Sequence, residues 1–510
     1  MFVFNRKNKT CIDYKERGLV KKKSIEKYTF YSPEWDNYLD EVAQYVQTSR
    51  FLPKYHLYPK TGLMNDPNGL SYFNGKYHVF YQWFPFDAAH GMKHWGHATS
   101  DNLVSFEDQG YAIIPDEEYE RHGAYSGNAF EYEGKLYLYY TANYKTDNGK
   151  IAKQALAVMD QTGKIEKYSG NPIIEGAPTG FSDELRDPFV FKRDGNFYML
   201  LGGSRFADGQ RRIGFGDIGE ILLYKSDDLF HWEYLGTIDL PIDKGYMLEC
   251  PSLTRIDGKD VLILSPMGVK REKYRFQNRF AAIYLIGKLD VKNRTFQVEM
   301  LDELDSGFDF YAPQTFYGRA DQSLMIGWFG CGEQIYPTDD EMWKHGLTMS
   351  QNLSIHNNRL YRYPIEELTN SFELNQCKKV KELFPNTKHY HVSFDININE
   401  NFELKVGSED DYWVFSNQVE TGLVSIHRGS LSAKIDEGYG QVRSIKAGDY
   451  FENNVTVDIF VDNSFVEVYL NKGERVFSFR VFLVNEKQIV KFSKQKKATL
   501  GNYRETHYVK

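Results

Sequence analysis

Three acidic residues stand at matching places in a repeated pattern of this sequence. Asp66, Asp187 and Glu249 precede the glycines of three similar turns by nine, eight and nine residues, and Ser126 precedes a fourth glycine by eight. If the repeat brings these places together, the carboxylates raise one another's pKa. One ionised carboxylate that attacks and one neutral carboxyl group that protonates the leaving oxygen would suit glycoside hydrolysis. The alternative is that these acids only begin turns, as aspartate often does.

The turns belong to a repeat of about 60 residues. A glycine turn at Gly75, Gly134, Gly195 and Gly258 precedes a run of apolar and aromatic residues each time, and a degenerate fifth copy lies at Gln322. Asparagine or aspartate followed by glycine between two strands is the strongest short signal for a hairpin. Five units of this length predict a propeller with four-stranded blades, in which matching positions near the inner strands converge on the central axis.

The sequence on either side of this array has a different texture. Residues 1–50 are expected to form an N-terminal extension with one short helix. Ser32-Pro33-Glu34 is typical of a helix start, and an apolar face follows at Trp35, Leu39, Val42 and Val46. Residues 51–368 would be the catalytic propeller, and residues 369–510, with short alternating strands, predict a sandwich. The predicted fold class is all-β, a five-bladed β-propeller followed by a C-terminal β-sandwich.

Composition and charge restrict the partners. The chain has 62 basic and 70 acidic residues, a net charge of −8, which gives no electrostatic reason to expect nucleic acid or an anionic membrane. We find no signal-peptide pattern and no apolar run long enough for a membrane span, so a cytoplasmic location is expected. Aromatic residues make up 16% of the chain; they favour strands, and their flat faces also suit sugars. Four scattered cysteines without a C-x-x-C pair favour neither a zinc nor a redox site.

Three histidines have a spacing that could bind zinc on a helix, namely His90, His94 and His97. However, the residues around His97 favour a strand, in which these rings would point to different faces. We therefore expect no metal and no cofactor.

The carboxylates lie within motifs that resemble those of glycoside hydrolase family 32, which holds invertases, sucrose-6-phosphate hydrolases and fructan β-fructosidases. The three main motifs are Met64-Asn65-Asp66-Pro67-Asn68-Gly69, Leu185-Arg186-Asp187-Pro188 and Leu248-Glu249-Cys250-Pro251. Further matches are Tyr81-Gln82, Tyr125-Ser126-Gly127 and Asp309-Phe310-Tyr311-Ala312. The resemblance runs in order through about residues 50–490. It implies the same architecture, a five-bladed propeller with a C-terminal β-sandwich.

The resemblance also implies roles for the residues. Asp66 would be the nucleophile that forms a fructosyl–enzyme ester, Glu249 the acid and then the base, and Asp187 the stabiliser of the oxocarbenium-like transition state. The residues expected to bind the substrate are Asn65, Gln82, Tyr125, Ser126, Arg186, Tyr311 and Trp328. Because the fructosyl cation is tertiary and relatively stable, positioning and charge stabilisation suffice without a metal.

We therefore hypothesise a retaining β-fructofuranosidase that acts on sucrose 6-phosphate or sucrose. The alternatives are an intracellular fructo-oligosaccharide or fructan hydrolase and, in a different class, a non-catalytic sugar-binding propeller. A sugar phosphate would require cationic donors. The basic run at 270–275 could supply them or could be a solvated loop, and Arg205 and Lys93 are further candidates.

Overall fold

The repeated glycine turns close hairpins in the structure, a computed structural model that describes residues 23–147, 149–210, 216–319, 321–433, 435 and 440–505. Asn74 and Gly75 both have positive φ, 49° and 77°, as a type I′ hairpin turn requires. The same conformation recurs at Glu133-Gly134, Asp194-Gly195 and Asp257-Gly258. The hairpins predicted at these four turns are confirmed. In the degenerate fifth copy, Ala320 lies outside the described residues, as do residues 1–22 of the expected N-terminal extension.

Each hairpin begins one of five blades. Blade one contains β1 (Gly62–Phe73), β2 (Lys76–Phe84), β3 (His94–Ser100) and β4 (Glu107–Ile113), with β19 (Trp343–Lys344) parallel to β1. Blade two contains β5 (Ala124–Tyr132), β6 (Lys135–Thr146), β7 (Gly149–Met159) and β8 (Ile165–Lys167). Blade three contains β9 (Phe181–Arg193), β10 (Asn196–Arg205), β11 (Ile218–Ser226) and β12 (Glu233–Thr237). Blade four contains β13 (Met247–Ile256), β14 (Lys259–Met267), β15 (Ile283–Asp290) and β16 (Thr295–Glu303). Blade five contains β17 (Tyr311–Thr315), β18 (Leu324–Trp328), β20 (Gln351–His356) and β21 (Arg359–Pro364).

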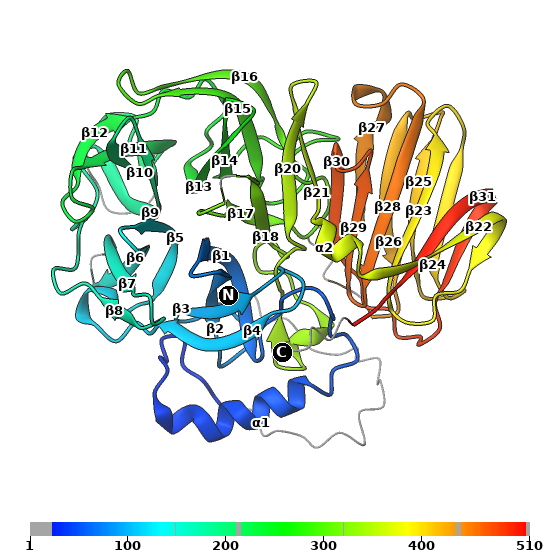
Figure 1. The fold of residues 1–510 in the computed structure, drawn as a ribbon, viewed down its shortest axis with the longest axis horizontal. Helices are drawn as coiled ribbons and strands as arrows, with labels where there is room; N and C mark the ends of the chain where they lie inside the picture. Colours follow the sequence, from blue (N-terminus) through cyan, green and yellow to red (C-terminus); the bar gives the residue numbers. More distant parts are fainter. Residues whose placement is uncertain are drawn as a thin grey trace.

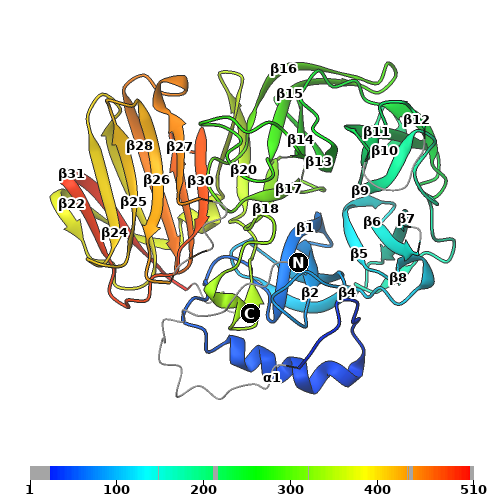
Figure 2. The ribbon, with the colours of Figure 1, turned by 180° about the vertical axis from the view of Figure 1, so that it is seen from behind.

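The first strands of the blades surround a common centre (Figure 1). Each packs beside the first strand of the next blade, and β17 packs beside β1, so the ring is closed. The same arrangement is seen from behind in Figure 2. Because these strands are equivalent, residues about 60 positions apart in the sequence occupy corresponding places around one axis.

The C-terminal part forms a single curled sheet of ten strands beside the propeller (Figure 1). After α2 (Glu366–Thr369), its strands are β22 (Phe372–Leu383), β23 (His389–Asn397), β24 (Phe402–Gly407), β25 (Tyr412–Gln418), β26 (Leu423–Ser430), β27 (Val442–Lys446), β28 (Asn454–Asp462), β29 (Phe465–Leu470), β30 (Arg475–Arg480) and β31 (Ile489–Tyr503). Strands β23, β25 and β26 alternate buried and more exposed residues, as the sequence pattern suggested, whereas β29 and β30 are buried on both faces. The predicted fold class is confirmed, with the sandwich made by one sheet that curls on itself.

The predicted N-terminal helix is α1 (Asp36–Val46), and a 3₁₀ turn at Pro33–Trp35 leads into it. Further 3₁₀ turns lie at Glu118–Glu120, Pro337–Asp339 and Ala447–Asp449. Leu39, Val42 and Val46 are buried, as their spacing predicted, and Trp35 packs edge-on against Phe86 with ring centroids 5.0 Å apart. The helix therefore covers the propeller next to blade one (Figure 2).

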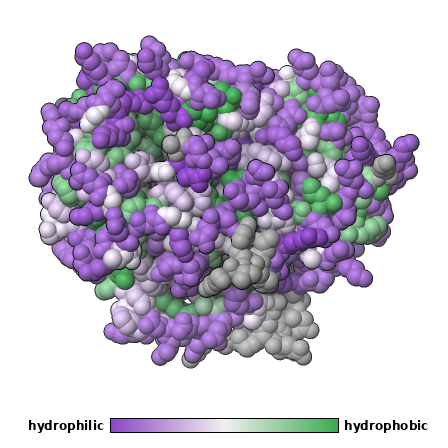
Figure 3. All heavy atoms as spheres, in the orientation of Figure 1, coloured by the Kyte–Doolittle hydropathy of each residue, from purple (hydrophilic) through white to green (hydrophobic). Residues whose placement is uncertain are grey.

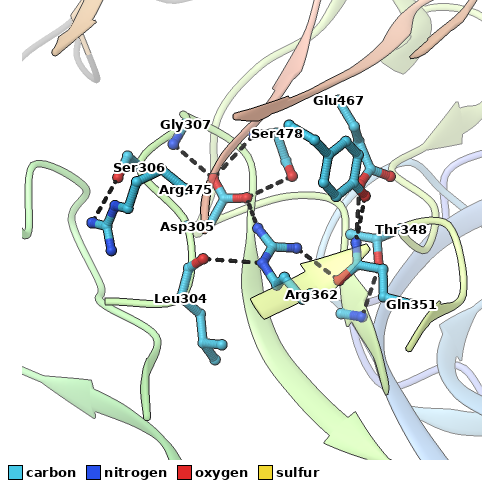
Figure 4. Close-up of polar contacts among 12 residues, drawn as sticks. Leu304, Asp305, Ser306, Gly307, Thr348, Gln351, Arg362, Glu467, Arg475 and Ser478 are labelled. Carbon is cyan, nitrogen blue, oxygen red and sulfur yellow. Dashed lines mark hydrogen bonds and ion pairs between the residues drawn. The ribbon is translucent and has the colours of Figure 1, made fainter. Parts of the chain in front are cut away.

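A buried polar network joins the propeller to the C-terminal sheet (Figure 4). The Asp305 carboxylate accepts hydrogen bonds from the backbone N–H and the hydroxyl of Ser478, at 3.0 and 2.6 Å, and pairs with Arg362. Arg362 also donates to the Gln351 amide oxygen at 2.8 Å. Buried charges are tolerated only when they are paired and hydrogen-bonded, so this network holds blade five in a fixed position on the sheet.

The face of the molecule shown in Figure 3 is mostly hydrophilic, and apolar residues form only small separate groups on it. This agrees with the mean hydropathy of −0.55. None of the helices in the described part of the chain has the length and apolar character needed to cross a membrane.

Candidate active site

The first strand of every blade is interrupted at the same place by a bulge. At each one, two residues face a single residue of the neighbouring strand. The pairs are Asn65-Asp66, Tyr125-Ser126, Asp187-Pro188, Cys250-Pro251 and Ala312-Pro313. In a regular strand, consecutive side chains point to opposite faces, whereas a bulge redirects them. The bulges of blades one to three therefore turn polar side chains toward the axis of the propeller, and in blades four and five the polar residues Glu249 and Tyr311 stand directly before the bulge.

A pocket of about 330 Å³ lies where these side chains meet. Nine of the ten predicted site residues line it, namely Asn65, Asp66, Gln82, Tyr125, Arg186, Asp187, Glu249, Tyr311 and Trp328. The tenth, Ser126, is fully buried and touches the pocket residue Asp66. The three carboxylates thus face one space from blades one, three and four.

Asp66 is held by polar side chains. The Ser126 hydroxyl donates to its Oδ2 at 2.6 Å, the Asn65 amide donates to its Oδ1 at 3.0 Å, and the Gln82 amide lies 3.5 Å from Oδ2. Burial raises the pKa of Asp66, and the nearby charge of Glu249 adds to this, while the bonds from Ser126 and Asn65 oppose it. These bonds fix one carboxylate in a definite orientation without neutralising it.

Asp187 is the most strongly perturbed of the three. Its φ is 62°, and its Oδ2 accepts the backbone N–H of Cys250 at 2.9 Å. Burial raises the pKa of Asp187 to about 7, with further contributions from the charges of Glu249 and Asp66, although Arg186 opposes the shift. Glu249 and Asp66 are therefore close enough to Asp187 for their charges to favour its protonated form.

The Cys250 thiol lies between the two aspartates. Its Sγ is 3.5 Å from Asp187 Oδ2 and 3.8 Å from Asp66 Oδ2. Burial and the neighbouring carboxylates raise the pKa of Cys250 well above its ordinary value. The sulfur therefore stays protonated and acts as a weak hydrogen-bond donor to the aspartates.

Glu249 has different neighbours. Arg186 Nε donates to its Oε1 at 2.8 Å, and the Tyr311 hydroxyl donates to its Oε2 at 2.6 Å. The Glu249 side chain is 17% exposed, so it is still reached by solvent. Arg186 also pairs with Glu184, and these carboxylates raise the pKa of the guanidinium above its ordinary value. The positively charged Arg186 therefore bridges the carboxylates of Glu249 and Glu184.

An aromatic wall completes the pocket. Trp328 lies with its ring centroid 6.2 Å from that of Tyr311, and the ring centroid of Phe280 lies 5.6 Å from that of Tyr311. The indole N–H of Trp328 is buried and has no hydrogen-bond partner among the described residues. Burial raises the pKa of Tyr125 to about 12, so its hydroxyl remains a donor at neutral pH. Apolar rings with a few free donors suit a sugar, which has both C–H faces and hydroxyl groups.

Several pocket residues were not predicted from the sequence as binding residues. Lys27 and Tyr28 come from the N-terminal segment, and Lys145 and Lys150 from the hairpin of β6 and β7. The two hairpin lysines could have been placed from the repeat, because β6 follows the strand that carries Ser126. Nothing in the pattern of residues 23–31 indicated that they reach the pocket.

Among the residues considered for a phosphate, only Lys93 lines the pocket. It donates to the Asn65 side-chain oxygen at 2.6 Å, and burial lowers its pKa to about 7. Arg205 pairs with Glu220 at 3.0 Å. In the basic run, Lys270 to Lys273 are exposed and Arg275 pairs with Asp302 at 3.1 Å, away from the pocket lining. The run therefore fits the solvated-loop interpretation.

The three histidines serve different contacts. His90 lines the pocket and lies 3.1 Å from Lys93. His94 contacts the backbone of Met92 and Tyr31, and His97 pairs with His78 at 3.0 Å. Within the described ranges, no group of three or more metal-binding side chains comes together.

Asp309, in the family-like motif Asp309-Phe310-Tyr311-Ala312, is not among the residues that line the pocket. It is fully buried, pairs with Arg428 at 2.9 Å and accepts the backbone N–H of Arg480 at 2.8 Å. It thus belongs to the interface with the C-terminal sheet, while Tyr311, two residues later, faces the site.

Comparison with known proteins agrees with this geometry. Residues 56–364 match the glycosyl hydrolases family 32 N-terminal domain, and residues 363–507 match the family 32 C-terminal model. A sucrose-6-phosphate hydrolase of Staphylococcus xylosus is 34% identical over 472 residues, which cover 90% of this chain and 92% of that protein. The structure of sucrose-6-phosphate hydrolase from Lactobacillus gasseri superimposes with a TM-score of 0.86 at 32% identity, over 94% of this chain and 98% of the other. A mutant GH32 β-fructofuranosidase of Bombyx mori in complex with sucrose gives a TM-score of 0.81 at 28% identity, over 92% and 98% of the two chains.

Proposed function

The chain belongs to glycoside hydrolase family 32 and is of the β-fructofuranosidase type, and from this premise we propose that it hydrolyses sucrose 6-phosphate by a retaining, two-step reaction. The choice of substrate is supported by the relatives at 32–34% identity that carry the name sucrose-6-phosphate hydrolase. The two-step reaction is supported by the two differently held carboxylates, Asp66 and Glu249, in one pocket.

In the first step, Asp66 attacks the anomeric carbon of the fructosyl unit. Its carboxylate is already oriented by Ser126 and Asn65, so little reorganisation is needed before the bond forms. Glu249 gives a proton to the glycosidic oxygen as the bond to the glucose unit breaks. An ester between Asp66 and fructose remains, and the glucose unit leaves as an alcohol.

In the second step, a water molecule takes the place of the glucose unit. Glu249, now a carboxylate, accepts a proton from this water as its oxygen attacks the anomeric carbon. The ester to Asp66 breaks, fructose is released, and both carboxylates return to their initial states. The Glu249 side chain is 17% exposed, so it can exchange protons with the leaving group and with water.

Asp187 and Arg186 support both steps. Asp187 is directed into the pocket by its bulge and would bind fructose hydroxyls while its negative charge stabilises the oxocarbenium-like transition state. Arg186, which hydrogen-bonds to Glu249, holds that carboxylate in place against the repulsion of the two aspartates. Asn65, Gln82 and Tyr125 provide further hydrogen bonds to the sugar.

The observation that carries this proposal is that Asp66 and Glu249 line the same pocket from different blades. We expect Asp66→Asn to reduce kcat at least about 10⁴-fold while leaving the circular dichroism spectrum and Tm close to those of the wild type. Asp101→Asn, in the exposed turn after β3, is the matched control and should keep full activity. Near-normal turnover of Asp66→Asn would contradict the assignment of the nucleophile.

The substrate is tested separately. We expect the wild-type kcat/KM for sucrose 6-phosphate to exceed that for sucrose and for a short fructan. A preference for the fructan would instead support the fructo-oligosaccharide hydrolase that the sequence left open, and a lack of turnover on all three would refute the proposed reaction.

A further inference from the structure

A segment from the N-terminal part of the chain, residues 23–31, runs along the rim of the pocket. It is fixed by the backbone N–H of Met92, which donates to Lys27 O at 2.7 Å, and by the N–H of Tyr31, which donates to His94 Nε2 at 2.9 Å. The Tyr31 ring also stacks on Tyr111, with centroids 4.0 Å apart. Lys27 and Tyr28 are thereby held in the lining of the pocket.

Two lysines on this rim lack a carboxylate partner. Tyr28 connects them, because it follows Lys27 in the chain and its hydroxyl hydrogen-bonds to the ammonium group of Lys145. Neither Lys27 nor Lys145 pairs with an acidic side chain among the described residues. By contrast, Lys150 pairs with Glu184 at 2.6 Å and Lys153 pairs with Glu175 at 3.0 Å on the same hairpin. The rim therefore carries two positive charges that form no ion pair with the described acidic side chains, although Glu333 lines the same pocket.

The charge of Lys27 acts on the interior of the pocket. Burial lowers the pKa of Lys93 to about 7 and that of His90 to about 3. The charge of Lys27 adds a smaller effect in the same direction to each, and Lys93 adds a larger one to His90. Positive charges gathered at one place repel one another. An anionic ligand group would remove this repulsion.

The position of the rim fits a substituent on the part of the substrate that leaves. The proposed cleavage holds fructose against Asp66 and Asp187, with Glu249 at the glycosidic oxygen. The glucose unit must then lie toward the mouth of the pocket, where Lys27 and Lys145 stand. Lysine is a common phosphate ligand as a point charge, and a phosphate monoester is nearly dianionic at neutral pH.

We propose that Lys27 and Lys145, joined through Tyr28, form the subsite that binds the phosphoryl group of a phosphorylated glucose unit. This inference rests on the proposed function, since it names the side chains that would distinguish sucrose 6-phosphate from sucrose. Tyr28 acts as a positioning residue that keeps the Lys145 ammonium group on the rim.

The test is a comparison of kcat/KM for sucrose 6-phosphate and for sucrose in full-length variants. A charge-assisted hydrogen bond to phosphate corresponds to about tenfold to a hundredfold in binding. We therefore expect Lys27→Met and Lys145→Met each to reduce the ratio of the two kcat/KM values at least about tenfold, mainly through KM for the phosphorylated substrate. Lys153→Met, on the same hairpin but paired with Glu175, is the matched control and should leave the ratio unchanged.

Two further measurements sharpen the test. Raising the salt concentration from 0.05 to 0.5 M should increase the wild-type KM for sucrose 6-phosphate, because exposed charges are screened, and this dependence should weaken in Lys145→Met. Tyr28→Phe should reduce the ratio less than either lysine variant.

An unchanged ratio in both lysine variants of an enzyme that prefers sucrose 6-phosphate would overturn the subsite and leave the proposed function standing. A wild-type enzyme that prefers unphosphorylated sucrose would overturn both.

Discussion

Replacing Asp187 by asparagine should make the protein more stable at alkaline pH while it abolishes the proposed activity. The backbone geometry can be kept, because asparagine readily adopts the φ of 62° observed at this position. The side-chain oxygen can also still accept the backbone N–H of Cys250. What the substitution removes is a buried negative charge next to two other carboxylates.

The magnitude and sign follow from the raised pKa. Asp187 titrates at about 7 in the folded protein against about 3.8 ordinarily, and a tenfold change in proton affinity is about 1.4 kcal/mol. Between these two pH values the folded protein binds more protons than the unfolded chain, so the free energy of unfolding falls as pH rises through this window. Above pH 7 the ionised carboxylate costs up to about 4 kcal/mol, and at pH 4 or below it costs almost nothing.

The assay is thermal unfolding followed by circular dichroism at pH 5 and pH 8. At pH 8 we expect the Tm of Asp187→Asn to exceed that of the wild type by about 2–6 °C, and at pH 5 we expect a clearly smaller gain. Asp101→Asn, which changes an exposed aspartate, should show no such difference between the two pH values. A lower Tm of Asp187→Asn at pH 8, or the same shift at both pH values, would refute the reasoning.

Three further substitutions test other parts of the structure. Glu249→Gln should lose about 10²–10⁴-fold in kcat/KM on sucrose but far less on an aryl fructoside whose leaving group needs no proton; equal losses would argue against Glu249 as the acid. Ser126→Ala removes the 2.6 Å bond to Asp66 and should reduce kcat about 10- to 100-fold, measured in steady-state kinetics, so an unchanged kcat would show that Asp66 is oriented without it. Arg362→Met leaves Asp305 buried without its cation and should lower the free energy of unfolding by about 3–5 kcal/mol, seen in urea denaturation, whereas an unaltered midpoint would contradict the role given to this interface.

The features that were predictable from the sequence depend on local conformation. The hairpin turns could be placed because a type I′ turn needs two consecutive residues with positive φ, and Asn74-Gly75 and its copies satisfy that need within two residues. The helix after Ser32 could be placed for the same reason, since its start and its apolar face are both local patterns. Once the turns were placed, the five copies of the repeat indicated five blades, and the repeat length of about 60 residues indicated four strands in each.

The remaining features depend on contacts between distant segments. Lys27 reaches the pocket because residues 23–31 are held by β3 and the loop before it, and no periodicity in the segment reflects this. Asp309 matched a family-like motif next to Tyr311, yet its partners Arg428 and Arg480 lie more than 100 residues later in the C-terminal sheet. Such pairings are decided by how the two parts pack, which the spacing of acidic residues does not encode.

The bulges explain why Asp66, Asp187 and Glu249 do not all stand the same number of residues before their turn glycines in the sequence. When the blades are aligned on their bulges, Asp187 corresponds to Cys250, whereas Asp66 stands one residue later, at the position of Pro251. Glu249 stands one residue earlier, at the position of Tyr311 in blade five. In a regular strand this offset of one would turn Glu249 away from the pocket. Because the strand is interrupted directly after Glu249, both Glu249 and Cys250 contact pocket side chains, Glu249 through Arg186 and Cys250 through the aspartates. The same irregularity therefore gives the site a partly exposed carboxylate for proton transfer and a thiol between the two aspartates, and a site built from regular strands could present only one of them.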